Sequence, residues 1–567
     1  MNFATIALLG FQLVAAAPAV THFFPSSVTR GGFPVLVSAE GSTGTDSKIW
    51  VDDEKLKVQA GPKSGQFLVE AVTGCRPGWH TVRLYNKEGA TNPIPVWVDD
   101  LPNFAETEPN NGPAQATSVP LHRMGSAAQL HGRLEKNGDI DGYLVKVPAG
   151  STLVARLEAN RHLGSPMDGT LQIVDKKGFV LAHNDDARGV DPEITWKATQ
   201  SAEVIVRVFA FPSEPNSTIS FAGGSSYIYR LMISTSETID HAASVVADKN
   251  STMLIPSGWN LSDSAAAGLL PTAGQSGYLI AVPEYSEPMV IPRTEFPVVS
   301  YNRKSPPAIS QFPVMLSGTI NELDESHVYQ IQAQKGEAIQ FRVFARQWES
   351  LLDPVLTIRD EKGQIVQEQD DSGNNTRDLE LTWTPPENGL YRLAISDLHG
   401  RSGLRMFYGV ECTREGIEPE AQISVTNLTL KAAEKAELAM NYDKRADLDI
   451  PLKVEFIGLP KGFPALKATE GAPSAPPAQT KGQGRRRRGP SGAGMNSLKF
   501  EINLTADQVK QIGEFSGPIR FQVKDNSGKS IPVSINGEKG KRLGLDHVWL
   551  TVLATPAKTE PPKAEKK

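Results

Sequence analysis

Six carboxylate and amide side chains in two short segments are the strongest candidates for chemistry in this sequence. They are Glu106, Glu108, Asn110, Asn111, Asp139 and Asp141. Calcium binds six to eight oxygen atoms, which come from carboxylates, amide and backbone carbonyls and water. If the two segments meet in space, they predict a structural calcium site. The alternative role is simpler: the two aspartates cap turns, and the first segment is a solvated linker.

Other catalytic or metal-binding patterns are missing from the sequence. There is no Gly-x-Ser-x-Gly motif, and none of the ten histidines forms a His-x-x-x-His pair. No Cys-x-x-Cys occurs, which excludes a zinc ribbon, and no Walker or Rossmann glycine pattern follows a strand. We therefore expect no catalytic residues and no enzymatic activity. A catalytic set assembled from distant residues stays open as an alternative.

Two pairs of adjacent aspartates, Asp185-Asp186 and Asp370-Asp371, lie where hairpin turns are expected. A general acid and base need a cleft and perturbed pKa values. Asx turns explain the pattern without catalysis, and this is our interpretation. A run of four arginines, Arg485 to Arg488, offers a site for an anionic polymer but is more typical of a solvated segment.

Composition narrows the class of protein. The chain has 567 residues and a net charge of −6, which gives no general case for nucleic-acid binding. Its 49 glycines and 41 prolines favour β-rich, turn-rich domains over helical bundles. The two cysteines, Cys75 and Cys412, cannot form a disulfide framework, and we interpret both as buried free thiols.

The N-terminus resembles an export signal. An apolar run from Ala4 to Ala17 is too short to span a membrane and ends in small residues that suit cleavage. No Lys or Arg precedes the run, so a misassigned start or a first strand is the alternative. No other stretch reaches the length of a membrane span. We expect an extracellular, periplasmic or cell-surface protein without a transmembrane segment.

A stretch of alternating apolar residues recurs along the chain. Tyr143, Val145 and Val147 alternate with Lys146, a pattern that predicts a half-buried strand. A second copy follows about one domain later and keeps its register, which indicates an internal duplication. The matched positions are Tyr143 with Tyr329, Gly150 with Gly336, Arg156 with Arg342, Asp168 with Asp353, Asp175 with Asp360, Gly178 with Gly363 and Trp196 with Trp383.

Both copies resemble the bacterial pre-peptidase C-terminal domain. The motifs of the first copy are Glu108-Pro109-Asn110-Asn111, Gly138 to Tyr143, Pro166-Met167-Asp168 and Asn184-Asp185-Asp186. The second copy keeps Leu352-Asp353-Pro354 and Asp370-Asp371 but lacks Glu-Pro-Asn-Asn. The resemblance implies secreted β-sandwiches that accompany peptidases and other extracellular enzymes. Related collagen-binding domains bind calcium through the equivalent segments, so it also implies that site.

The chain as a whole is predicted to be all-β, a tandem array of jelly-roll-like and immunoglobulin-like β-sandwich domains. The expected divisions are a signal peptide (1–19), an immunoglobulin-like domain (22–102), the first pre-peptidase-type sandwich (104–235), a small immunoglobulin-like domain (238–300), the second sandwich (305–414), a C-terminal β domain (417–555) with a disordered insert (470–495), and a disordered tail (556–567).

The second copy serves as an internal control for the calcium site. His327 falls opposite Asp141, Glu325 falls opposite Asp139, and the segment Ser300-Tyr301-Asn302-Arg303 replaces the acidic one. A cation and an imidazole would stand where ligands are needed. The sequence therefore predicts no calcium site in the second copy.

These features predict a monomeric, exported, non-catalytic protein that binds or spaces other molecules, with calcium as a structural ion. The expected partners are an extracellular protein or polysaccharide, or a secreted peptidase, and not nucleic acid. Trp79, Trp259 and Trp348 offer surfaces for stacking on sugars, although tryptophan in a β-sandwich more often lies in the core. The alternative is an accessory subunit, or a remnant, of a secreted peptidase or another extracellular hydrolase.

Overall fold

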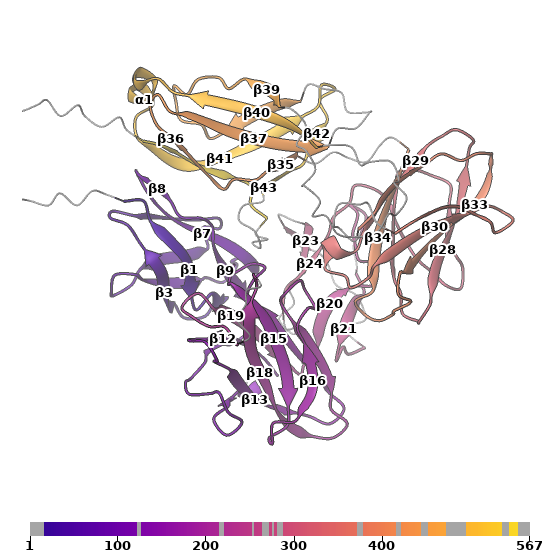
Figure 1. Cartoon of the computed structure of the whole chain (residues 1–567), viewed down its shortest axis with the longest axis horizontal. Helices are drawn as coiled ribbons and strands as arrows, with labels where there is room; N and C mark the ends of the chain where they lie inside the picture. The colour runs from indigo at the N-terminus through magenta and orange to yellow at the C-terminus, as the bar shows by residue number, and fades with distance from the viewer. Residues whose placement is uncertain are drawn as a thin grey trace, which may run out of the picture.

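The structure is a computed structural model, and it confirms an all-β array of sandwiches (Figure 1). It describes residues 16–121, 126–214, 220–251, 254–263, 272–274, 277–280, 287–370, 378–414, 421–443, 452–471, 495–535 and 544–553. Most of the expected signal peptide, the arginine run and the tail lie outside these residues. Among the described residues, no helix is both long and apolar enough to cross a membrane.

The N-terminal domain is a sandwich of a four-stranded and a five-stranded sheet. Its first strand begins at Ala19, so the boundary expected at residue 19 overlaps the strand by one residue. One sheet has the order β1 (Ala19–Phe24), β3 (Val35–Ser42), β6 (Gln66–Ala71), β5 (Leu56–Ala60). The other has the order β2 (Ser27–Thr29), β9 (Ile94–Asp99), β7 (Gly78–Asn86), β4 (Lys48–Val51), with β8 (Gly89–Ala90) paired to β7.

The first module, 103–234, consists of two five-stranded sheets. One sheet has the order β10 (Asn103–Ala105), β12 (Ala127–Arg133), β19 (Ile228–Ser234), β14 (Thr152–Glu158), β17 (Glu193–Lys197). The other has the order β11 (Thr117–Ser118), β13 (Asp141–Val147), β18 (Ala202–Pro212), β15 (Met167–Val174), β16 (Val180–Asn184).

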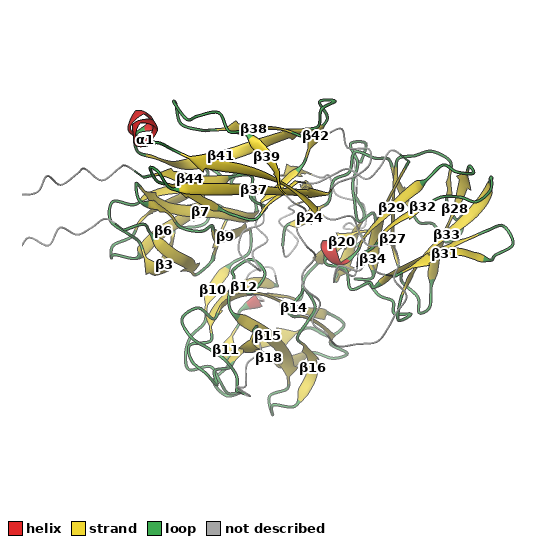
Figure 2. Cartoon of the chain, turned by 45° about the horizontal axis from the view of Figure 1, so that its top comes forward, coloured by secondary structure: helices red, strands yellow, loops and turns green. Residues whose placement is uncertain are grey.

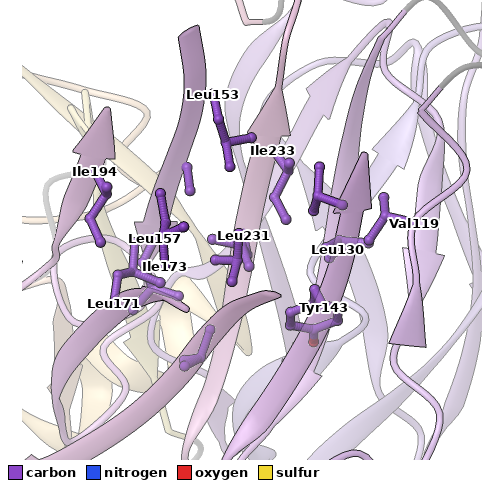
Figure 3. Close-up of a cluster of buried hydrophobic side chains, with 14 of the residues drawn as sticks. Val119, Leu130, Tyr143, Leu153, Leu157, Leu171, Ile173, Ile194, Leu231 and Ile233 are labelled. Atoms are coloured by element: carbon purple, nitrogen blue, oxygen red, sulfur yellow. The ribbon is translucent and has the colours of Figure 1, made fainter. Parts of the chain in front are cut away.

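The core of this module lies between its two sheets (Figure 3). Tyr143, Val145 and Val147 are buried and Lys146 is exposed, as the alternation predicts. Leu231 of β19 faces the same core from the opposite sheet. The period of two along each strand therefore sets which face of the sheet is buried.

The second module, 298–413, repeats this strand order in both sheets. One sheet has the order β25 (Val298–Ser300), β27 (Val314–Thr319), β34 (Phe407–Thr413), β29 (Ile339–Phe344), β32 (Glu380–Trp383). The other has the order β26 (Ala308–Ile309), β28 (Ser326–Ala333), β33 (Gly389–Asp397), β30 (Pro354–Arg359), β31 (Ile365–Gln369). A short 3-10 helix, η3 (Arg346–Trp348), follows β29.

The segment between the modules differs from the expected immunoglobulin-like domain of 238–300. Its described residues form a two-stranded and a three-stranded sheet: β20 (Thr238–Ala242) with β21 (Pro256–Trp259), and β22 (Thr272–Gly274), β23 (Gly277–Ile280), β24 (Met289–Ile291). The boundaries at 300 and 305 were wrong, because β25 pairs in parallel with β27 and so belongs to the second module. A strand of three residues gives too weak a periodic signal to be assigned from sequence.

The C-terminal domain is another sandwich of two sheets. One has the order β39 (Ala468–Gly471), β40 (Met495–Asn503), β37 (Lys435–Asp443), β35 (Ala421–Ile423), β43 (Val533–Ile535). The other has the order β36 (Asn427–Leu430), β44 (Val548–Val552), β41 (Phe515–Lys524), β38 (Lys453–Ile457), with β42 (Ser530–Ile531) on β41. The helix α1 (Ala506–Ile512) begins with a capping box between Thr505 and Gln508.

The insert expected at 470–495 was placed too widely. Gly471 pairs with Ser497 in the β39–β40 hairpin, and Met495 already belongs to β40. The residues between 471 and 495 lie outside the described part of the chain. The pairing of the flanking strands fixes both edges of the insert, which composition alone cannot do.

A buried ionic cluster joins the two modules through the segment between them. The guanidinium group of Arg188 contacts Glu193 at 3.0 Å, Asp240 of β20 at 2.9 Å and Glu349 of the second module at 2.7 Å. Arg405, also from the second module, lies 3.7 Å from both Glu193 and Asp240. Charges withdrawn from water need such partners, so these contacts hold the modules against each other.

The N-terminal and C-terminal domains also touch, as Figures 1 and 2 both show for their neighbouring sheets. The buried Arg83 of β7 donates hydrogen bonds to Asn427 Oδ1 at 2.7 Å and to the carbonyl oxygen of Thr426 at 3.2 Å. Its guanidinium group also lies 5.6 Å from the ring centre of Trp549. The two ends of the array therefore fold back onto each other.

Candidate metal site

The ends of two strands in the first module bring three carboxylates together. Glu106 directly follows β10 and continues its pairing with β12, because its amide donates to the carbonyl oxygen of His131 at 2.9 Å. Asp141 is the first residue of β13, in the opposite sheet. One carboxylate oxygen each from Glu106, Glu108 and Asp141 lie within 4.8 Å of one another. We call these three residues the carboxylate cluster.

Several oxygens around the carboxylate cluster have no hydrogen-bond partner. Asp141 and Asn110 are both 0% exposed. Asp141 Oδ1, Glu106 Oε2 and the Asn110 side-chain oxygen are buried with no donor beside them, apart from a proton that Glu106 and Asp141 can share. Buried polar atoms normally have partners, so either that shared proton or a cation must satisfy the two carboxylates. A group of carboxylate and amide oxygens of this kind fits a calcium ion.

The raised pKa values of the carboxylate cluster are also consistent with a bound cation. Burial raises the pKa of Glu106 to about 7, and the charges of Glu108 and Asp139 add to the effect. Burial and then the charge of Glu106 hold the pKa of Asp141 well above its ordinary range. Like charges this close either retain a proton or bind a cation.

The structure separates the six predicted ligands into three groups. Glu106, Glu108 and Asp141 form the carboxylate cluster. Asn110 is buried in the same segment as Glu106 and Glu108, and its backbone amide donates to Glu108 Oε2 at 3.0 Å. Asp139 instead accepts the amide hydrogen of Glu135 at 2.6 Å, which is the turn-capping role. Asn111 is exposed and is not part of the carboxylate cluster.

Sequence reasoning missed the tyrosine that orients Asp141. Tyr229 of β19 donates its hydroxyl hydrogen to Asp141 Oδ2 at 2.5 Å and contacts the hydroxyl of Tyr143 at 2.6 Å. A side chain at Gly132 would meet the ring of Tyr229 at 2.1 Å, so this position needs glycine. Tyr143 carried a motif signal, whereas Tyr229 lies 88 residues from Asp141 and carried none.

The second module replaces every member of the carboxylate cluster. The amide of Tyr301 donates to Ser317 after β25 just as that of Glu106 donates to His131 after β10. Tyr301 therefore stands at the position of Glu106, and Arg303 at that of Glu108. His327 replaces Asp141 and bonds through Nδ1 to the hydroxyl of Tyr408 at 2.7 Å.

The replacement residues make a closed structural unit. The rings of Tyr301 and His327 stack with centres 3.7 Å apart. Burial lowers the pKa of His327 to about 4, although Glu325 opposes the shift. Glu325 accepts the amide hydrogens of Asn321 and Glu322, so it caps the turn that Asp139 caps in the first module. Because the copy without the carboxylate cluster keeps this cap, the cap is structural.

The remaining sequence candidates are not members of the carboxylate cluster. Asp185 and Asp186 are exposed next to β16, and burial followed by the charge of Asp185 raises the pKa of Asp186. Asp371 lies outside the described residues. Cys75 and Cys412 are both buried and free. The rings of Trp348 and Phe344 stack with centres 4.9 Å apart.

Comparisons with known proteins give partial matches. No family model matches the chain. Over 98 residues, 17% of the chain, it is 34% identical to a probable subtilase-type serine protease of Deinococcus radiodurans, of which it covers only 13%. The pre-peptidase C-terminal domain of Bacillus anthracis collagenase aligns with 21% of this chain and 97% of its own, at 13% identity and a TM-score of 0.16. Sidekick-1 immunoglobulin domains 1–4 align with 94% of this chain and 98% of their own, at 10% identity and a TM-score of 0.20.

Proposed function

We propose that this chain is an exported, non-catalytic protein that presents binding surfaces on a calcium-stiffened array of β-sandwiches. Both modules are pre-peptidase C-terminal domains in this proposal, and the partner is an extracellular protein or polysaccharide. The observation that carries the proposal is the carboxylate cluster with its unpartnered oxygens, set beside a second module of the same strand order without it.

The calcium ligands would be Glu106, Glu108 and Asp141, together with the side-chain oxygen of Asn110. Calcium would supply positive charge where three carboxylates otherwise repel each other. Water would complete the six to eight oxygens that the ion requires. Asp139 and Asn111 are left out of the ligand set because Asp139 caps a turn and Asn111 is exposed.

The position of the carboxylate cluster suggests what calcium does. The segment from Glu106 continues β10, and Asn103 of β10 is fastened to the N-terminal domain. Asn103 Oδ1 accepts the hydroxyl hydrogen of Ser27 at 2.6 Å, and its Nδ2 donates to Thr29 at 2.8 Å. An ion that orders Glu106 and Glu108 against β13 would stiffen this joint between domains. Binding to the folded state alone also stabilises it by mass action.

Calcium titration calorimetry on the full chain tests the proposal. We expect one saturable site, abolished by Asp141→Asn and weakened by Glu106→Gln. A matched change in the second module, His327→Asn, should leave the titration unchanged. Absence of heat in the unmodified chain, or binding that survives Asp141→Asn, would refute the calcium site.

A second candidate function is an accessory subunit of a secreted peptidase. The 98 residues shared with a subtilase-type protease support it. This role predicts a peptidase gene beside this one and stable co-purification of the two products. The binding role predicts capture by matrix protein or polysaccharide in the absence of any peptidase.

A further inference from the structure

A second group of potential metal ligands lies in the N-terminal domain, far along the sequence from the carboxylate cluster. Asp53 lies in the turn after β4, Cys75 lies in the turn before β7, and His80 lies within β7. One ligand atom from each residue falls within 4.8 Å of the other two. Cys75 and His80 are each 1% exposed, and Asp53 is half-buried at the edge.

The distances match those of a small thiophilic ion. Cys75 Sγ lies 3.8 Å from His80 Nε2 and 3.9 Å from Asp53 Oδ2. Tetrahedral zinc, with bonds of about 2.3 Å to sulfur and about 2.0 Å to nitrogen or oxygen, places such pairs about 3.6 Å apart. The two contacts of the sulfur would need to shorten by about 0.2–0.3 Å around an ion.

The imidazole is also held as metal-binding histidines usually are. His80 Nδ1 donates to the carboxylate of Asp52 at 2.9 Å, and Nε2 lies 2.6 Å from the carbonyl oxygen of Arg76 and 3.8 Å from Cys75 Sγ. A carboxylate on the far nitrogen fixes the ring and increases the basicity of the ligating one. The contact between Asp52 and His80 was not recognised in the sequence, because the two residues are more than twenty positions apart.

We propose that Asp53, Cys75 and His80 bind a thiophilic divalent cation of the zinc class, with water at the fourth position on the side of Asp53. The site is separate from the carboxylate cluster, whose oxygen ligands suit calcium. The proposal goes beyond the proposed function and does not depend on it.

Binding must release protons, because the imidazole carries two in the described state. His80 Nε2 donates to the carbonyl oxygen of Arg76 at 2.6 Å, while Nδ1 donates to Asp52. An ion would displace the Nε2 proton, which now bonds to the carbonyl oxygen of Arg76, and the Cys75 thiol proton. Two protons therefore leave for each ion bound.

Burial argues against a nucleophilic role for the same residues. Cys75, His80 and Asp52 resemble a cysteine catalytic set, but a thiol 1% exposed cannot reach a substrate. The imidazole also cannot act as a base while both of its nitrogens donate hydrogen bonds.

The ion would link the two sheets of the N-terminal domain beside its contact with the first module. Trp79 adjoins His80 in β7 and stacks on His162 of the first module, with ring centres 4.8 Å apart. Cys75 lies between β6 of one sheet and β7 of the other. A bond from Cys75 to His80 would therefore hold the strand that presents Trp79.

Cobalt(II) added to the reduced full chain tests this site, because a cobalt–thiolate bond gives a charge-transfer absorption band. We expect a band that saturates at one ion per chain, disappears when zinc is added, and is lost in Cys75→Ser. The other thiol is the matched control, since Cys412 is packed in the core of the second module and its thiol donates to the carbonyl oxygen of Val410. Cys412→Ser should therefore keep the band.

Two further variants separate ligand loss from misfolding, with circular-dichroism melting run on each. Asp52→Asn should keep the band but weaken cobalt affinity ten- to hundredfold, as loss of an outer carboxylate does. Asp141→Asn should leave cobalt binding unchanged. The proposal is overturned if no band forms at millimolar cobalt, if the band survives Cys75→Ser, or if it disappears in Cys412→Ser.

Discussion

Replacing Asp141 with asparagine should have opposite effects on stability with and without calcium. The substitution keeps an oxygen that can accept the Tyr229 hydroxyl hydrogen, and it removes a carboxyl group whose pKa is held well above its ordinary range. In chelator the change relieves repulsion with Glu106, whose charge raises the pKa of Asp141. In calcium the same change removes a ligand.

The pKa of Glu106 sets the size of the effect. A shift from 4.5 to about 7 corresponds to at most about 3.5 kcal/mol, at about 1.4 kcal/mol for each pKa unit. Glu106 holds its proton more tightly in the folded state, so stability is present below pH 4.5 and is lost as pH rises toward 7. The raised pKa of Asp141 carries a cost of the same kind at pH 7, and its removal in Asp141→Asn should stabilise the module by about 1–2 kcal/mol. Calcium at one hundred times its Kd should stabilise the unmodified chain by about 2.7 kcal/mol.

Thermal melting at pH 7, followed by calorimetry, measures both effects. In chelator we expect the first module of Asp141→Asn to melt at a higher temperature than that of the unmodified chain, by about 2–8 °C for each kcal/mol of added stability. In saturating calcium we expect the order to reverse. Asp139→Asn is the control and should lower the transition equally in both conditions, because Asp139 caps a turn. Equal destabilisation of Asp141→Asn with and without calcium would refute the reasoning.

Three other predictions follow from buried contacts. Arg188→Met should destabilise the joined modules by about 3–5 kcal/mol in denaturant unfolding, because it leaves buried carboxylates unpaired. The control Arg293→Ala removes an exposed ion pair and should cost under about 1 kcal/mol. Gly132→Ala should lower the free energy of unfolding by about 1–3 kcal/mol, because its Cβ would overlap Tyr229. The control Gly389→Ala has room for a Cβ and should lower it less. With a folded pKa of about 4 and an ordinary value of 6.5, His327 contributes stability that is complete above pH 6.5 and lost toward pH 4, by at most about 3 kcal/mol; in melting curves His327→Gln should flatten this dependence, and an unchanged slope would contradict it.

Local patterns in the sequence were enough to predict the fold class, and they also predict an internal duplication. Alternation around Tyr143 predicts which face of β13 is buried, and the strand order of the two modules agrees with the proposed repeat. The replacement of Asp141 by His327 was also visible in the aligned copies. These features depend on neighbours in sequence or on a period of two, so one strand carries enough information to show them.

Part of the carboxylate cluster was predictable for the same reason. Glu106, Glu108 and Asp141 belong to motifs at two strand ends, and the sandwich brings those ends together. The sequence-based ligand set includes Asp139, only two residues from Asp141, but in the structure Asp139 accepts the amide hydrogen of Glu135. Which of two aspartates faces the acidic segment depends on the direction of each side chain, and spacing does not give that direction.

The contacts that required the tertiary structure join residues far apart in sequence. Tyr229 reaches Asp141 across 88 residues, and Arg188 reaches Glu349 across 161. Asp52 orients His80 from a different turn of the N-terminal domain. Periodicity gives the buried face of each strand, whereas the partner across a sandwich or a domain interface is set by how the sheets pack. Burial then makes those partners necessary, because a charge withdrawn from water is stable only beside a group that compensates it.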